Sequence, residues 1–130
     1  MAERTVTWLV YTCLVGLIPV IARVAVWSVS KSGVEPLAVA DLVAFGLVLH
    51  SANINEVSRF KNADARWTAV HNGASIVFLI LYALILFTTI LPEQQLDARS
   101  LLRSTVALCV VSFILSLAVF LRLQTEGDQA

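Results

Sequence analysis

The sequence predicts an all-α integral membrane protein, a bundle of four transmembrane helices in an up-down-up-down arrangement. Of its 130 residues, 58% are hydrophobic and 14% are charged, and the mean hydropathy is +0.84. Soluble domains are nearer half apolar and a quarter charged. The apolar residues are also gathered in four runs, each of about the 20 residues that a helix needs to cross hydrocarbon. Residues 1–130 are therefore expected to form a single membrane domain.

The first span is expected over residues 6–29 and the second over residues 34–53. The first run contains Arg23 and has no small-residue cleavage site after it, which favours an uncleaved helix over a signal peptide. Pro19 removes a backbone hydrogen bond and is expected to bend this helix. In the turn between the two spans, Gly33 can adopt a positive φ, and Pro36 suits the first turn of the next helix.

The third span is expected over residues 67–91 and the fourth over residues 101–123. The third is polar at its start and apolar from Ile76 to Phe87, a half that is expected to face lipid. A connector over residues 54–66 precedes it. The connector begins with "NINEVSRF", which contains no helix breaker, so the second helix can continue into water before the chain turns near "KNAD".

The charges indicate an orientation and exclude one class of partner. Lysines and arginines concentrate on the cytoplasmic side of membrane proteins. Five such residues flank the spans on one side and three on the other, which favours a cytoplasmic location for both termini and the connector. A plasma or inner membrane is expected. The five are Arg4, Arg59, Lys61, Arg66 and Arg122, and the three are Lys31, Arg99 and Arg103. The formal net charge of zero gives no basic field for nucleic acid.

Arg23 and Asp41 form the sharpest local signal, because both lie inside expected spans. An ionised side chain at that depth costs on the order of 3 kcal/mol or more unless it is compensated. The two positions are symmetric about the turn at residues 31–33, so an antiparallel hairpin brings them to one depth, roughly 10 Å below the interface at 1.5 Å per residue. They form either a polar node that lines a pore, proton path or ligand site, or an ion pair that locks two helices, and the latter is favoured.

Three further sets of residues are candidates. A small, weakly polar stripe on the fourth span serves helix packing or lines a narrow pathway: Thr105, Cys109, Ser112 and Ser116. A polar cap after the second span is either solvated or docks a cytoplasmic partner: Asn53, Asn55, Glu56, Arg59 and Lys61. His50 and His71 bracket the connector and could ligate haem or a metal, but no further ligand cluster supports this, so interfacial hydrogen bonding is favoured and neither cofactor nor metal is expected.

Two functions from different classes remain open, and neither is enzymatic, because the sequence contains no nucleophile elbow, Walker loop, HExxH or nucleotide fingerprint. The first is a homo-oligomeric channel-like, transport or membrane-sensing component embedded in the lipid bilayer. The second is an accessory or anchor subunit of a larger membrane complex, which docks a cytoplasmic protein through residues 53–66. Cys13 and Cys109 share no redox spacing and are expected to be buried small hydrophobes.

Overall fold

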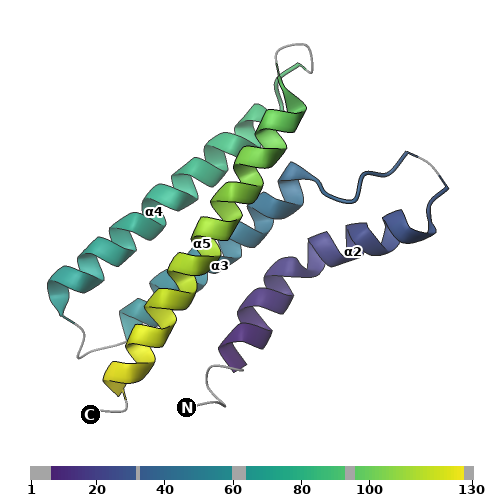
Figure 1. Ribbon diagram of the computed structural model, residues 1–130. Helices are drawn as coiled ribbons and strands as arrows, with labels where there is room; N and C mark the ends of the chain where they lie inside the picture. The colour runs from purple at the N-terminus through teal and green to yellow at the C-terminus, as the bar shows by residue number, and fades with distance from the viewer. Residues whose placement is uncertain (1–6, 32, 60–63, 93–95, 128–130) are drawn as a thin grey trace.

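The computed structural model describes residues 7–31, 33–59, 64–92 and 96–127, which form helices joined by short non-helical segments. Its elements are η1 (Leu9–Leu14), α2 (Val15–Val29), α3 (Val39–Arg59), α4 (Ala65–Thr88) and α5 (Ala98–Gly127). Since η1 runs directly into α2, these elements make four rods, and no strand occurs in the ranges given above (Figure 1).

The first rod is bent along its length (Figure 1). It contains two recognised causes of a bend. The segment η1 is a π-helix, in which each backbone hydrogen bond joins residues five apart instead of the four of an α-helix, and α2 carries Pro19 in its interior. The bend allows the first half of the rod to pack on α3, while the second half diverges from the bundle in Figure 1.

The linker before α3 is longer than the sequence suggests. Gly33 has the positive φ predicted for it, at 89°. The helix begins only at Val39, however, so Pro36 lies ahead of it and not in its first turn. At its other end α3 continues to Arg59, well past the boundary at residue 53 that was predicted for the span. The second rod is therefore shifted along the chain relative to the apolar run that predicts it.

Helices α4 and α5 both begin just after the aspartate of an Asp-Ala-Arg sequence. Asp64 accepts a hydrogen bond of 3.0 Å from the backbone N–H of Arg66. Asp97 accepts hydrogen bonds from the backbone N–H groups of Arg99 and Ser100, at 3.1 and 3.2 Å, and from the Ser100 hydroxyl at 2.6 Å. The first N–H groups of a helix have no partner within it, so these carboxylates satisfy them and fix where the helices begin.

Helix α3 is the centre of the bundle. It packs on α4, α5 and the first rod, whereas α4 and α5 touch each other much less. Two of its close approaches depend on glycine. Gly16 of α2 lies against Phe45 and Val48 of α3, and a Cβ on Gly46 of α3 would lie only 2.0 Å from the Tyr82 ring of α4. Small residues at these positions let the helices come close, as at helix contacts in membranes.

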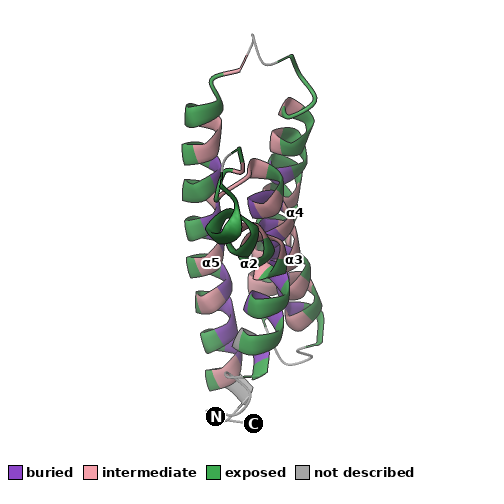
Figure 2. Ribbon diagram, turned by 90° about the vertical axis from the view of Figure 1, so that its right-hand side faces the viewer, coloured by how far each residue is buried: buried purple, intermediate pink, exposed green. Residues whose placement is uncertain are grey.

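The outer faces of the other rods are exposed (Figure 2), and many of the residues there are large and apolar. Three helical stretches are long and apolar enough to cross a membrane: Val10–Val29, Ala65–Thr88 and Ala98–Thr125. This is compatible with a membrane protein. Helix α3 does not meet that description, because it carries several charged and amide side chains, so the prediction of four spans is supported for three of them.

One expectation about α4 needs correction. Its later half was expected to face lipid, and Ile80, Leu84 and Phe87 are indeed exposed. Tyr82 lies in the same half, yet no part of it is exposed. The ring is covered because it fills the space above Gly46 on α3. The apolar run therefore contains one residue, Tyr82, that faces the inside of the bundle and carries a polar hydroxyl.

Candidate functional site

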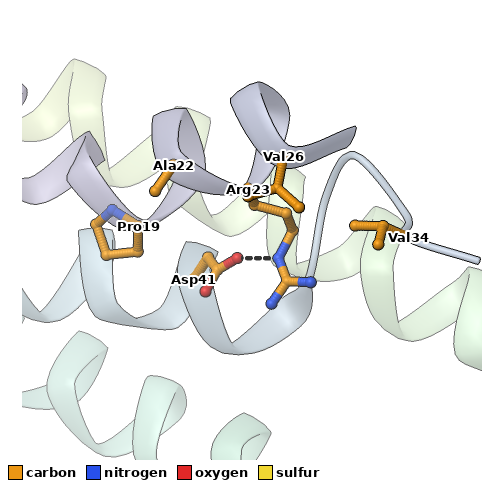
Figure 3. A pocket seen from close by; sticks show the side chains of 6 residues that line it. All are labelled: Pro19, Ala22, Arg23, Val26, Val34 and Asp41. Atoms are coloured by element: carbon orange, nitrogen blue, oxygen red, sulfur yellow. Dashed lines mark hydrogen bonds and ion pairs between the residues drawn. The ribbon is translucent and has the colours of Figure 1, made fainter. Parts of the chain in front are cut away.

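Arg23 of α2 and Asp41 of α3 are in contact. The guanidinium Nε of Arg23 donates a hydrogen bond to Oδ2 of Asp41, so an ion pair joins the two helices across the linker (Figure 3). The Asp41 side chain is 17% exposed and that of Arg23 is 36% exposed. The pair is therefore neither sealed in the core nor fully solvated.

The two terminal Nη groups of Arg23 make no hydrogen bond to any residue that the structure describes. In Figure 3 one of them points away from the Asp41 carboxylate, and no dashed line joins either of them to it. A pocket of about 310 Å³ opens beside them, and its other walls are Pro19, Ala22, Val26 and Val34. Asp41 thus holds the guanidinium at one edge and leaves its other donors available, an arrangement that can bind an anionic group.

The stripe predicted on the fourth span lies on α5 and faces the inside of the bundle. All four of its residues are buried: Thr105, Cys109, Ser112 and Ser116. Three of them contact other helices. Cys109 Sγ donates to the Leu42 carbonyl at 3.2 Å, and Ser116 Oγ accepts a bond of 2.8 Å from Asn53 Nδ2. The polar groups of this stripe are used in helix contacts, which favours the packing interpretation over the pathway.

Ser112 is the centre of a buried polar cluster. Its hydroxyl lies 2.9 Å from His50 Nε2 and 2.9 Å from Tyr82 Oη, so one serine joins α3, α4 and α5. Tyr82 Oη is also 3.5 Å from Cys109 Sγ. The ring of His50 stacks on Phe78 with centroids 4.6 Å apart.

The cluster leaves His50 Nδ1 buried and without a partner among the described residues. A buried N–H group without an acceptor costs more free energy than a buried lone pair without a donor. We therefore assign the proton to Nε2, which donates to Ser112, and leave a lone pair on Nδ1. Sequence reasoning did not single out Tyr82, because it lies within an apolar run. The feature of the sequence that could have identified Tyr82 is Gly46, the glycine of α3 that packs against its ring.

The polar cap divides into two parts. Asn53 is 5% exposed and bonded to Ser116, so it belongs to the interior and is not available to a partner, contrary to the prediction. Asn55 and Arg59 are exposed. Glu56 is partly buried and lies 3.9 Å from Arg59. Lys61 is outside the described residues.

The two histidines have separate surroundings. His50 is buried inside the bundle in the cluster around Ser112 and is hydrogen-bonded there, while its place at the membrane interface stays a prediction. His71 Nδ1 lies 2.9 Å from the carbonyl of Trp67 in its own helix, and its ring is 4.2 Å from that indole. Within the described ranges, no group of three or more histidine, cysteine, aspartate or glutamate residues is arranged to hold a metal ion.

Comparison of the chain with known protein families, with curated proteins and with solved structures gives no match. The chemistry of the two polar sites is therefore the basis for function. The cluster around Ser112 is buried and nearly satisfied, which suits a structural role. The Arg23–Asp41 pair is half open, adjoins a pocket and retains unused donors, so it is the better candidate for binding.

Proposed function

We propose that this chain is a multi-pass membrane protein that acts as a homo-oligomeric transport, channel-like or membrane-sensing component, with the Arg23–Asp41 pair as its working site. In this proposal all four rods cross the bilayer up-down-up-down, with both termini in the cytoplasm of a cell bounded by a plasma or inner membrane. The observation that carries the proposal is the half-open ion pair with unused guanidinium donors beside a pocket. Charged groups inside membranes are costly, and they commonly mark ligand or ion sites.

The position of α3 supports its being the fourth span. Alone it is too polar to be stable in lipid, but in the bundle the His50 imidazole and the Asn53 amide point inward, where Ser112 and Ser116 bond to them. The other rods place their apolar faces outward, as lipid requires. A polar helix that is covered by three apolar helices can remain in the membrane even though its own sequence is not hydrophobic enough to span it alone.

The use of the α5 stripe in packing bears on the kind of activity. A pore through one bundle would need a continuous line of available polar groups, but Cys109, Ser112 and Ser116 are engaged between helices and the Thr105 hydroxyl is bonded within α5. The open polar site lies instead on the side of the bundle, between α2 and α3. This favours transport or sensing at a lateral pocket over conduction through a single subunit.

The second half of α2 supports assembly of several copies. Five of its exposed residues are large and apolar: Ile21, Val24, Val26, Trp27 and Val29. This half diverges from its own bundle (Figure 1), so it is free to pack on a neighbouring copy within the bilayer. A neighbour packed there would also wall the open side of the pocket that contains Arg23.

The test is to reconstitute the purified protein in native-lipid nanodiscs and in liposomes. Native mass spectrometry of the nanodiscs gives the subunit number, and pH-sensitive and potential-sensitive dyes in the liposomes report flux. We expect a discrete oligomer, and either a flux or a ligand-dependent change that Arg23→Gln abolishes and Arg103→Gln preserves. Arg103 is the matched control, because it is an exposed arginine on α5 outside the pocket. A strictly monomeric protein, or an activity unaffected by Arg23→Gln, would overturn the proposal.

A second function, that of an anchor subunit, is favoured by one observation. Helix α3 extends beyond the apolar run and presents Asn55 and Arg59 at its exposed end. Purification from native membranes under mild conditions should then recover a stoichiometric cytoplasmic partner that the double variant Asn55→Ala/Arg59→Ala releases. Recovery of the chain with copies of itself alone would exclude this function.

A further inference from the structure

We propose that Arg23, together with Glu35, binds the headgroup of a zwitterionic phospholipid that carries a primary ammonium, of the phosphoethanolamine type. The lipid phosphate lies on the free edge of the Arg23 guanidinium, and the ammonium lies beside Glu35. This inference names the ligand of the proposed working site and rests on the proposed embedding of the chain in lipid, but it does not depend on the number of subunits.

Arg23 forms a wall common to two pockets. One, of about 310 Å³, has the apolar walls Pro19, Ala22, Val26 and Val34. The other, of about 450 Å³, extends over the linker that contains Glu35 and reaches Ala98 and Leu102 at the start of α5. An amphiphile that spans Arg23 can therefore place an apolar portion on one side of the guanidinium and a polar portion on the other.

The donors at this boundary suit a phosphate. Arginine presents five N–H donors in a planar fork that matches two oxygens of a phosphate group. Asp41 accepts from Nε and so fixes the plane of the fork, while the Nη groups remain available (Figure 3). Asp41 is in this sense a positioning residue, and phosphate oxygens would complete the hydrogen bonds of the guanidinium.

The charge of the site selects among phosphate lipids. Arg23 contributes one positive charge, and Asp41 and Glu35 contribute two negative charges, so these three residues together carry one negative charge. A lipid with a net negative charge is disfavoured by this balance. A headgroup with one phosphate and one ammonium adds no net charge, and its ammonium can donate to Glu35, which makes no hydrogen bond or ion pair within the part of the chain that the structure describes. A quaternary ammonium has no N–H to donate.

The position in the fold also suits a lipid headgroup better than a soluble phosphate. The site lies where α2 ends and the chain runs through a non-helical linker to α3, and non-helical backbone belongs near the membrane surface. Val15 and Ile18 are exposed apolar residues of α2 on the side of Arg23 away from the linker, and they continue from Pro19 of the pocket along the helix. They give the acyl chains of a bound lipid an apolar surface to follow.

The test is native mass spectrometry of the full chain, released from micelles that contain equal amounts of phosphatidylethanolamine, phosphatidylcholine and phosphatidylglycerol, with inorganic phosphate added in a parallel sample. We expect the ethanolamine lipid to remain bound in preference to the other two. Arg23→Gln should reduce its apparent affinity by about tenfold or more, as expected for loss of charge-assisted hydrogen bonds. Glu35→Gln should leave lipid binding but remove the preference for ethanolamine over choline. Arg103→Gln should leave both properties unchanged.

The possible outcomes separate the lipid proposal from the proposed function. Equal retention of all three lipids, retention unaffected by Arg23→Gln, or binding of inorganic phosphate alone would overturn the lipid assignment. The same spectra give the subunit number, so a monomer that binds the ethanolamine lipid selectively would overturn the assembly and leave this inference standing. Circular dichroism of each variant establishes that it is folded, and Glu35, which lies on an exposed linker, provides a substitution that spares the helix contacts.

Discussion

Replacement of Gly46 by alanine tests the packing of α3 against α4. A Cβ at this position would lie 2.0, 2.3 and 2.5 Å from three carbons of the Tyr82 ring. The ring would have to retreat by about 1.4 Å to regain ordinary contact at 3.4 Å, the difference between 3.4 and 2.0 Å. Tyr82 has no exposed surface, so the movement disturbs its neighbours and its 2.9 Å contact with Ser112.

The cost follows from two effects. Overpacking of a well-filled core costs about 1–3 kcal/mol, and loss of one hydrogen bond between membrane helices costs about 0.6 kcal/mol. We expect Gly46→Ala to lower the free energy of unfolding by about 2–4 kcal/mol. The assay is reversible unfolding in mixed micelles by titration with a denaturing detergent, followed by circular dichroism.

Gly73→Ala is the matched control, because it makes the same change in α4 at a site where a Cβ meets nothing within 4 Å. It should be neutral or stabilising by up to about 1 kcal/mol, the helix propensity difference between the two residues. The double variant Gly46→Ala/Tyr82→Ala should cost less than the sum of its parts, since the shortened side chain leaves room for the new methyl group. If Gly46→Ala were as stable as the native chain, the close approach of α3 and α4 would be refuted.

Three further predictions concern polar residues. Arg23→Ala should lower the free energy of unfolding by less than the roughly 3–5 kcal/mol typical of fully buried pairs, because this pair is half open. The double variant Arg23→Leu/Asp41→Leu should recover most of the lost stability. Equal loss in both variants, measured by the same unfolding titration, would contradict this. Ser112→Ala should cost about 1–3 kcal/mol, because it leaves two buried partners unsatisfied, whereas the exposed Ser104→Ala should be neutral. The hydroxyl and the backbone N–H of Ser100 donate hydrogen bonds to the Asp97 carboxylate and lower the pKa of Asp97 below the ordinary value of about 3.9. The folded state then binds fewer protons than the unfolded one, so the stabilisation is present above that value and is lost as the pH falls through the lower folded pKa. Thermal melts should show this loss in the native chain and not in Asp97→Asn.

Part of the fold follows directly from the sequence. The four rods correspond to four apolar runs, because burial of apolar surface and internal hydrogen bonding both favour helices in lipid. The symmetry of Arg23 and Asp41 about a turn was enough to place them at one level, and they are in contact in the structure. The absence of a helix breaker after residue 53 correctly predicted that the second helix continues, and it does so to Arg59.

Other features depended on contacts between distant segments, which hydrophobic patterning does not encode. The extended stretch before Val39 is apolar and reads as part of a span, although Pro36 lies within it. Asn53 resembles a solvated cap residue until Ser116, 63 positions away, is placed beside it. Tyr82 is concealed among exposed apolar neighbours, and its inward direction depends on Gly46 in another helix. The first error concerns where a helix begins, and the other two concern which side of a helix meets its neighbour, which helical periodicity alone leaves open.

The central claim is that lipid surrounds this bundle and that the polar helix α3 lies inside it. Power-saturation EPR in liposomes tests both parts, with single nitroxide labels on a cysteine-free background at Ile80 of α4, Ile114 of α5 and Leu49 of α3. The first two should be accessible to oxygen and inaccessible to a water-soluble nickel reagent, and the buried Leu49 should be shielded from both. Access of the nickel reagent to Ile80 and Ile114, or of oxygen to Leu49, would contradict the account.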